Sequence, residues 1–129
     1  MKKITIVDTD ITIDFLRGQQ SAITFFKSKS ESISFSAITV AEIYSGIKTR
    51  NEEIEIERLF SIFPVIPINS DIARLAGKLV KQYRLSHNVE IPDALIAATC
   101  LLSDAELFTL NIKHYPMFKV LKPLYRKSS

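Results

Sequence analysis

Cysteine is nearly absent from this sequence, because Cys100 is the only one among 129 residues. A single cysteine cannot form a disulfide within the chain, and its place in the apolar run 94–102 indicates a small core residue rather than a reactive thiol. The longest apolar run is far shorter than the roughly 20 residues that a membrane-spanning helix needs. Asp8 also interrupts the first apolar stretch, which is not typical of a signal peptide. We therefore expect a protein of the reducing cytoplasm that does not associate with membranes.

Internal repeats, low-complexity segments and linkers are also missing, so the sequence predicts one domain over residues 1–129. The chain is 47% hydrophobic and 24% charged, which is the composition of a compact domain with its own core. Its net charge is only +3, although Lys122, Arg126 and Lys127 form a basic end. A weak positive charge permits an anionic partner but does not identify one.

The hydrophobic pattern predicts strands that alternate with helices. Short β-branched or alternating runs predict strands at 4–7, 32–36, 65–68, 107–110 and 119–121. Apolar residues at helical spacing predict helices at 11–16, 22–27, 39–48, 53–63 and 93–102, and a long helix capped by Asn69 or Ser70. This order is typical of an α/β fold with a central, mostly parallel sheet flanked by helices on both faces.

Four polar residues, Asp8, Glu42, Asp93 and Asn111, stand where an apolar stretch gives way to a turn or a helix start. Each has a local explanation. Asp8 can cap a helix, Glu42 can complete a capping box that Thr39 begins, Asp93 suits a first helical turn, and Asn111 can begin a turn. Together, however, these strand ends and helix starts can open on one edge of a parallel sheet, which is where ligands bind in such folds.

Three carboxylates at one site require a compensating charge or proton. At a separation of about 4 Å and an effective dielectric constant near 20, each pair repels by about 4 kcal/mol, so the groups must be protonated, hydrated or bound to a cation. Oxygen ligands without paired Cys or His favour Mg²⁺ or Mn²⁺ over zinc. Such a cation can hydrolyse a phosphodiester with few other protein groups.

Four short segments carry a family resemblance: IVDTD at 6–10, SAITVAEIYSG at 36–46, PDALIAA at 92–98 and FTLNIKHY at 108–115. Their order and spacing resemble the PIN-domain ribonucleases, and among these the VapC-type toxins of bacterial and archaeal toxin–antitoxin pairs. The resemblance implies an endoribonuclease that depends on Mg²⁺ or Mn²⁺. It also implies that Asp8, Glu42 and Asp93 form the acidic metal site, and that Asn111 is the fourth catalytic residue.

The chain departs from the family pattern at two positions. Asp10 stands where relatives commonly carry Asn or Ser, and it can add charge or only cap a helix. His114 stands where many relatives have an acid, and we interpret it as a solvated turn residue near the site. The Thr109 hydroxyl is a candidate partner for Asp8. Basic residues that follow or flank the site elements could contact RNA phosphates: Arg17, Lys48, Arg50 and Lys113.

The resemblance further implies a small cognate antitoxin that covers the site. We expect it to bind an apolar groove made by the helices of segment 39–63. Self-association as a homodimer is also expected, because this segment holds more apolar residues than one helix face can bury: Ile54, Ile56, Leu59, Phe60, Ile62 and Phe63.

Three alternative functions remain open from the sequence. Asp8 to Thr12 matches the D-x-D-x-T signature of haloacid dehalogenase-like phosphatases, with Asp8 as nucleophile and Asp10 as acid or base, but the later Gly-Asp pair of that family is missing. A receiver-like binding module would need an acid after the strand at 65–68, where only Asp71 stands. A PIN-like module without catalysis is the third, and metal-dependent RNA cleavage separates all three from a nuclease.

Overall fold

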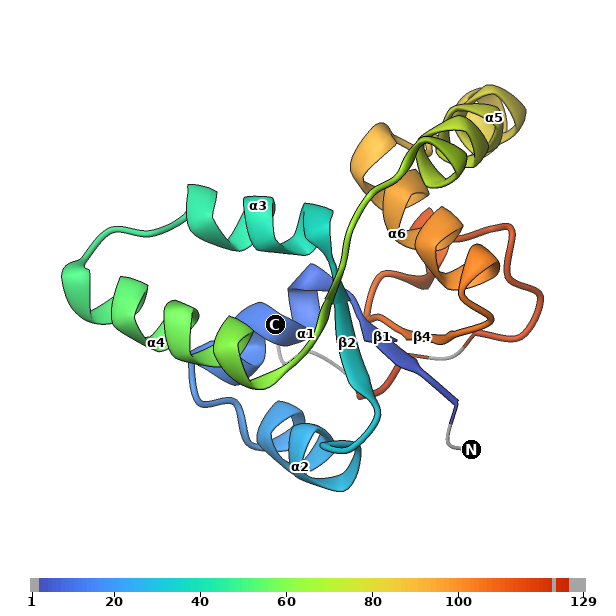
Figure 1. The fold of residues 1–129 in the computed structure, drawn as a ribbon. Coiled ribbons are helices and arrows are strands. Elements are labelled where there is room, and N and C mark those ends of the chain that lie inside the picture. The colour runs from blue at the N-terminus through green and yellow to red at the C-terminus, as the bar shows by residue number, and fades with distance from the viewer. Residues whose placement is uncertain (1–2, 122, 126–129) are drawn as a thin grey trace.

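The computed structural model describes residues 3–121 and 123–125, and its elements follow the predicted alternation (Figure 1). In chain order they are β1 (Thr5–Val7), α1 (Thr9–Leu16), α2 (Gln20–Ser28), β2 (Ile33–Ser36), α3 (Ala37–Ser45), α4 (Arg50–Ile62), β3 (Val65–Ile66), α5 (Ser70–His87), α6 (Ile91–Leu102), β4 (Glu106–Phe108) and the 3₁₀ helix η1 (Ile112–His114). The predicted α/β class is therefore confirmed.

The four strands form one parallel sheet in the order β3-β2-β1-β4. β1 lies inside the sheet, and its residues Thr5 to Val7 pair with Glu106 to Phe108 of β4. Because all pairs are parallel, every strand ends at the same edge of the sheet. Asp8, Ser36 and Thr109 each directly follow or end a strand there, so the topology gathers their side chains at one edge.

Helices cover both faces of this sheet, as predicted. Successive side chains of a strand point to opposite faces. Ile6 and Leu107 accordingly belong to a core cluster with α5 and α6, whereas Val7 and Phe35 belong to a second cluster with α1, α2 and α4. Figure 1 shows α5 and α6 on one side of the sheet and α1, α2 and α4 on the other. Cys100 is buried in the first cluster, in agreement with its predicted core role.

Side-chain caps set where the helices begin. Asp8 caps α1, since its carboxylate accepts a hydrogen bond from the Thr9 amide at 2.7 Å, and Asn69 caps α5 through the Ile72 amide at 2.9 Å. α3 begins earlier than predicted because Ser36, the last residue of β2, is its cap. A strand residue thus serves directly as a helix cap, and no loop separates the two elements.

The predicted strand at 119–121 is wrong, because the structure has no strand there. Val120 is 88% exposed, and of the two apolar residues in this run it is Leu121 that packs against the first core cluster. A side-chain contact holds the chain further on, where the Tyr125 hydroxyl donates to Asp14 at 2.7 Å. The basic end formed by Lys122, Arg126 and Lys127 lies outside the described residues. In the described part of the chain, no helix is both long and apolar enough to cross a membrane.

The second cluster makes a specific prediction for stability. Phe35 is fully buried and contacts the rings of Phe26, Phe60 and Phe63. We expect Phe35→Ala to lower the free energy of unfolding by about 3–5 kcal/mol, because it leaves a cavity between β2 and α4. Ile62→Ala, at a position that is 63% exposed, should change it by less than about 0.5 kcal/mol. Urea unfolding followed by circular dichroism measures both, and equal losses would contradict the proposed core.

Candidate metal centre

Asp8 is buried at the carboxyl end of β1, with 5% of its surface exposed. Its Oδ1 accepts the Thr9 amide that begins α1. Its Oδ2 accepts two hydroxyl groups, Thr109 Oγ1 at 2.6 Å and the phenol of Tyr115 at 2.9 Å. The local explanation of Asp8 as a cap and its predicted place among the site residues are therefore compatible, because different oxygens serve the two roles.

Asp93 faces Asp8 from the first turn of α6. Its Oδ1 lies 3.4 Å from the Tyr115 hydroxyl, and its Oδ2 lies 3.2 Å from His114 Nδ1. Burial, together with the charges of Asp8 and Glu42, raises the pKa of Asp93 to about 6, against the opposing effect of His114. The three predicted acids are thus close enough for the charges of two of them to act on the third.

Glu42 does not complete a capping box, and that local explanation is wrong. α3 is already capped by Ser36, so Thr39 lies inside its first turn. The Glu42 carboxylate instead accepts the Thr9 hydroxyl at 2.7 Å, and the Thr9 and Thr39 hydroxyl oxygens lie 3.1 Å apart. Glu42 is therefore directed toward the start of α1, next to Asp8.

Asn111 is exposed beside the site, and its side-chain amide donates to Asp10 Oδ2 at 3.1 Å. The same oxygen of Asp10 accepts the Leu110 amide at 3.0 Å, while its Oδ1 accepts the Ile11 amide at 2.7 Å. Asp10 is therefore not the cap of α1, which is Asp8, but a residue of its first turn. It connects the start of that helix to the segment that follows β4.

Thr109 and His114, two other predicted site residues, both contact an acid of the site. The expected hydrogen bond from Thr109 to Asp8 is confirmed. His114 is exposed, with 51% of its side-chain surface accessible, as expected for a solvated turn residue near the site, and its Nδ1 also lies 3.2 Å from Asp93 Oδ2. A histidine placed there can compensate part of the acidic charge when it is protonated.

Tyr115 is a site residue that the sequence analysis missed. The segment His114-Tyr115-Pro116 has the composition of a turn, and an aromatic residue in a turn carries no signal for a polar contact. In the structure the ring is buried and its hydroxyl contacts both Asp8 and Asp93.

The four basic residues expected to contact RNA lie in different environments. Arg17 and Lys48 line a cavity of about 370 Å³ that Glu42 also lines. Arg50 instead pairs with Glu53 at 2.9 Å and Glu57 at 3.6 Å on its own helix. Lys113 is exposed on η1. Arg17 and Lys48 thus share a cavity with a predicted site acid.

The donor set fits a hard divalent cation, although no ready-made group of three ligands is assembled among the described residues. The predicted ligands offer oxygen atoms only, which is the preference of Mg²⁺ and Mn²⁺. The raised pKa of Asp93 reflects first its burial and then the repulsion from Asp8 and Glu42, and a bound cation would offset both. The residues therefore fit such an ion by chemistry and charge.

Comparison with known proteins gives a consistent result. The PIN domain family model matches residues 5–116, so the limits of 1–129 for the domain stay a prediction. The chain is 41% identical to Ribonuclease VapC10 of Mycobacterium tuberculosis over 121 residues, which are 92% of this chain and 90% of that one. Ribonuclease VapC19 of the same organism is 36% identical, with coverage of 93% and 98%. A toxin–antitoxin complex from Klebsiella pneumoniae superposes with a TM-score of 0.81 at 29% identity and covers 95% and 99% of the two chains. The chain belongs to the PIN domain family.

Proposed function

We propose that this protein is a metal-dependent endoribonuclease and the toxin of a type II toxin–antitoxin pair. The proposal is carried by the convergence of Asp8, Glu42 and Asp93 at the carboxyl edge of the sheet, where the first and second raise the pKa of the third. The names of the two VapC relatives support RNA as the substrate. We expect the protein to act in the cytoplasm, where that substrate is present.

Each site residue has a distinct task in this proposal. Asp8, Glu42 and Asp93 would hold Mg²⁺ or Mn²⁺ through their carboxylates. When bound, such an ion neutralises charge on the phosphate and lowers the pKa of a water molecule at the site. Thr9 and Thr109 orient Glu42 and Asp8 through their hydroxyl groups.

Asn111 and the two cavity-lining basic residues complete the proposed site. Because the amide nitrogen of Asn111 is committed to Asp10, its carbonyl oxygen is the atom that would meet the ion or a water molecule. Arg17 and Lys48 are positioned beside Glu42 and would contact RNA phosphates on that side.

The phosphatase and receiver alternatives lose their support. Both depend on folds other than the PIN domain, to which this chain belongs. Asp10, the acid or base of the phosphatase alternative, is instead engaged by the Leu110 amide and the Asn111 side chain. A PIN domain that binds without cleaving RNA remains the alternative that an activity assay must exclude.

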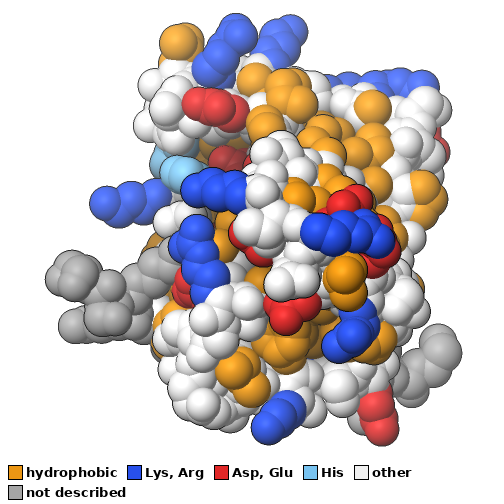
Figure 2. Space-filling model, turned by 90° about the vertical axis from the view of Figure 1, so that its left-hand side faces the viewer, with side chains coloured by type: hydrophobic (Ala, Val, Ile, Leu, Met, Phe, Trp, Pro, Cys, Tyr) orange, Lys and Arg blue, Asp and Glu red, His pale blue; other side chains and the backbone are white. Residues whose placement is uncertain are grey.

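The antitoxin partner follows from the solved complexes, since the Klebsiella pneumoniae neighbour is a toxin–antitoxin complex. A groove suited to it runs between α4 and the pair α1 and α2, rather than within segment 39–63 alone. Two cavities of about 370 and 460 Å³ form this groove, and Leu16 lines both. Figure 2 looks onto the side of α3 and α4, where apolar side chains lie in hollows between charged ones. An amphipathic helix fits such a groove.

A homodimer remains part of the proposal, with a smaller apolar surface than the sequence indicates. Ile56 and Leu59 are buried, and Phe60 and Phe63 pack against the second core cluster. Exposed apolar side chains are nevertheless present on α4 and on α6: Ile54, Ile62, Leu101 and Leu102. These are the surfaces that a second copy would cover.

Removal of one acid should abolish RNA cleavage. We expect Asp8→Asn and Asp93→Asn each to reduce the cleavage rate by about 100-fold or more with Mg²⁺ or Mn²⁺, since even residues that only support metal ligands contribute 10- to 100-fold. Asp104→Asn, at an exposed loop position, is the matched control and should keep the wild-type rate. Wild-type cleavage by a folded Asp93→Asn variant would contradict the proposed nuclease site.

The raised pKa of Asp93 predicts how stability depends on pH. The folded, metal-free protein binds this proton more tightly than the unfolded chain does, because the pKa is about 6 rather than 3.8. Its contribution to stability is therefore present below pH 4 and is lost as the pH rises to 6. In EDTA, Asp93→Asn should raise the melting temperature by a few degrees at pH 7.5 and much less at pH 4. Thermal melts at both pH values measure this, and a difference independent of pH would refute it.

If the partner binds in this groove, a charged residue placed there should weaken its binding. Leu16→Glu places a charge where the two cavities meet, and we expect it to weaken binding of the small protein encoded beside this one by about 30-fold or more. Leu102→Glu, on the exposed end of α6, is the control. Calorimetric titration with the purified partner provides the measurement, and unchanged affinity of Leu16→Glu would exclude this groove.

A further inference from the structure

Tyr115 directly follows η1 and is 1% exposed. Its hydroxyl lies 2.9 Å from Asp8 Oδ2 and 3.4 Å from Asp93 Oδ1. We propose that Tyr115 is a positioning residue that holds the carboxylates of Asp8 and Asp93 in the arrangement a divalent cation requires. The inference rests on the proposed metal site, and it assigns to this tyrosine a task that belongs to none of the acids.

The Tyr115 hydroxyl lies closer to Asp8 than to Asp93, so its two contacts differ in strength. A phenol has one hydrogen to donate. The shorter distance directs that hydrogen to Asp8, while the Asp93 oxygen stays within a weaker contact on the other side. The phenol thus fixes one carboxylate directly and limits the approach of the other.

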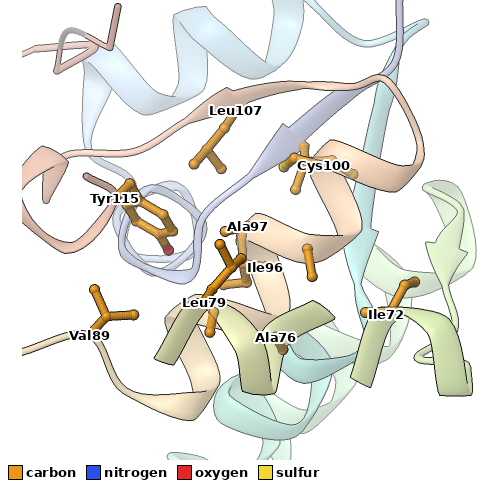
Figure 3. Packing of buried hydrophobic residues seen from close by; sticks show 12 residues of the cluster. Ile72, Ala76, Leu79, Val89, Ile96, Ala97, Cys100, Leu107 and Tyr115 are labelled. Carbon is orange, nitrogen blue, oxygen red and sulfur yellow. The ribbon is translucent and has the colours of Figure 1, made fainter. Parts of the chain in front are cut away.

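The ring that carries this hydroxyl is held by the core. Tyr115 belongs to the buried cluster on the α5 and α6 face of the sheet, together with Leu79, Val89, Ile96 and Leu107. Figure 3 shows its ring among these side chains. A close-packed ring cannot swing away without opening a cavity, so the position of the hydroxyl is set before any ligand arrives. This is pre-organisation rather than an adjustment on binding.

Thr109 provides an internal comparison. Its hydroxyl donates to the same oxygen, Asp8 Oδ2, at 2.6 Å. Thr109 follows β4, the strand beside β1, so this bond joins neighbours at the sheet edge. Among the described residues, Tyr115 is the one whose side chain contacts both Asp8 and Asp93. Removal of its hydroxyl should therefore affect a property that depends on both acids together, which is affinity for a shared cation.

The phenol also remains a donor throughout the working pH range. An ordinary phenol has a pKa of about 10, so it keeps its hydrogen near neutral pH. The group therefore does not add a negative charge to the site. It contributes a fixed hydrogen atom between two acids.

The test is Tyr115→Phe, which removes the hydroxyl and keeps the volume of the ring. Calorimetric titration with Mn²⁺ should show affinity weakened by about 10- to 100-fold, the usual effect of losing a group that orients a metal ligand. RNA cleavage should fall at low Mn²⁺ and recover most of its rate at saturating Mn²⁺. Tyr83→Phe removes a hydroxyl from α5 instead and is the matched control, expected to bind Mn²⁺ as wild type does. Unchanged Mn²⁺ affinity in Tyr115→Phe would overturn the inference.

A second variant guards against loss of folding in Tyr115→Phe. Incorporation of 4-aminophenylalanine at position 115 fills a similar volume and still donates a hydrogen bond, so Mn²⁺ affinity should remain within a few-fold of wild type. A drop as large as the one expected for Phe would equally overturn the inference. The Mn²⁺ titration also separates this inference from the proposed function. A wild-type protein that binds Mn²⁺ without cleaving RNA would refute the nuclease, and the effect of Tyr115→Phe on affinity could still be measured.

Discussion

The carboxylate of Asp8 is buried at the end of β1, and the arrangement around the site follows from the need to satisfy it. A buried carboxylate is tolerated only with hydrogen-bond partners. Three donors meet this need, and they come from the start of α1, from the end of β4 and from the residue after η1. The strand order places β4 beside β1, so the topology brings the Thr109 hydroxyl to Asp8 without any long connection. One buried acid thereby joins the start of α1 to Thr109 and Tyr115, which lie 101 and 107 residues further along the chain.

Asp93, the second acid, is destabilised in its ionised form when no metal is bound. Asp93 lies at the start of α6, where a helix dipole favours a negative charge. Burial and the charge of Asp8 nevertheless dominate, and the pKa of Asp93 rises in spite of His114. The protein thus keeps an acid in a position that opposes its ionisation. Such local destabilisation is common at functional sites. A cation at the site would stabilise the ionised acid, and this relief would favour cation binding.

Sequence patterns predicted the parts of this structure that local chemistry determines. The acid after β1, the Asn69 cap and the core position of Cys100 each follow from residue type and spacing, and the parallel sheet follows from the order of strands and helices. The prediction failed where a tertiary context decides. Glu42 fits a capping box with Thr39, but Ser36 takes the cap because β2 runs directly into α3. The run 119–121 has the residues of a strand, but Val120 is 88% exposed and Leu121 packs against the first core cluster without any strand pairing.

The segment from Thr109 to Tyr115 illustrates the same limit at the site itself. Within seven residues it contacts Asp8 through Thr109, Asp10 through Asn111, and Asp93 through His114. Tyr115 then donates to the same oxygen of Asp8 as Thr109 does. Neither the helical nor the strand repeat of side-chain directions describes these contacts, because the chain passes from a strand end through a turn into a 3₁₀ helix. The sheet brings the acids to one edge, but this segment determines how their oxygens are oriented, so the geometry of the site depends on a stretch of chain whose pattern resembles an ordinary turn.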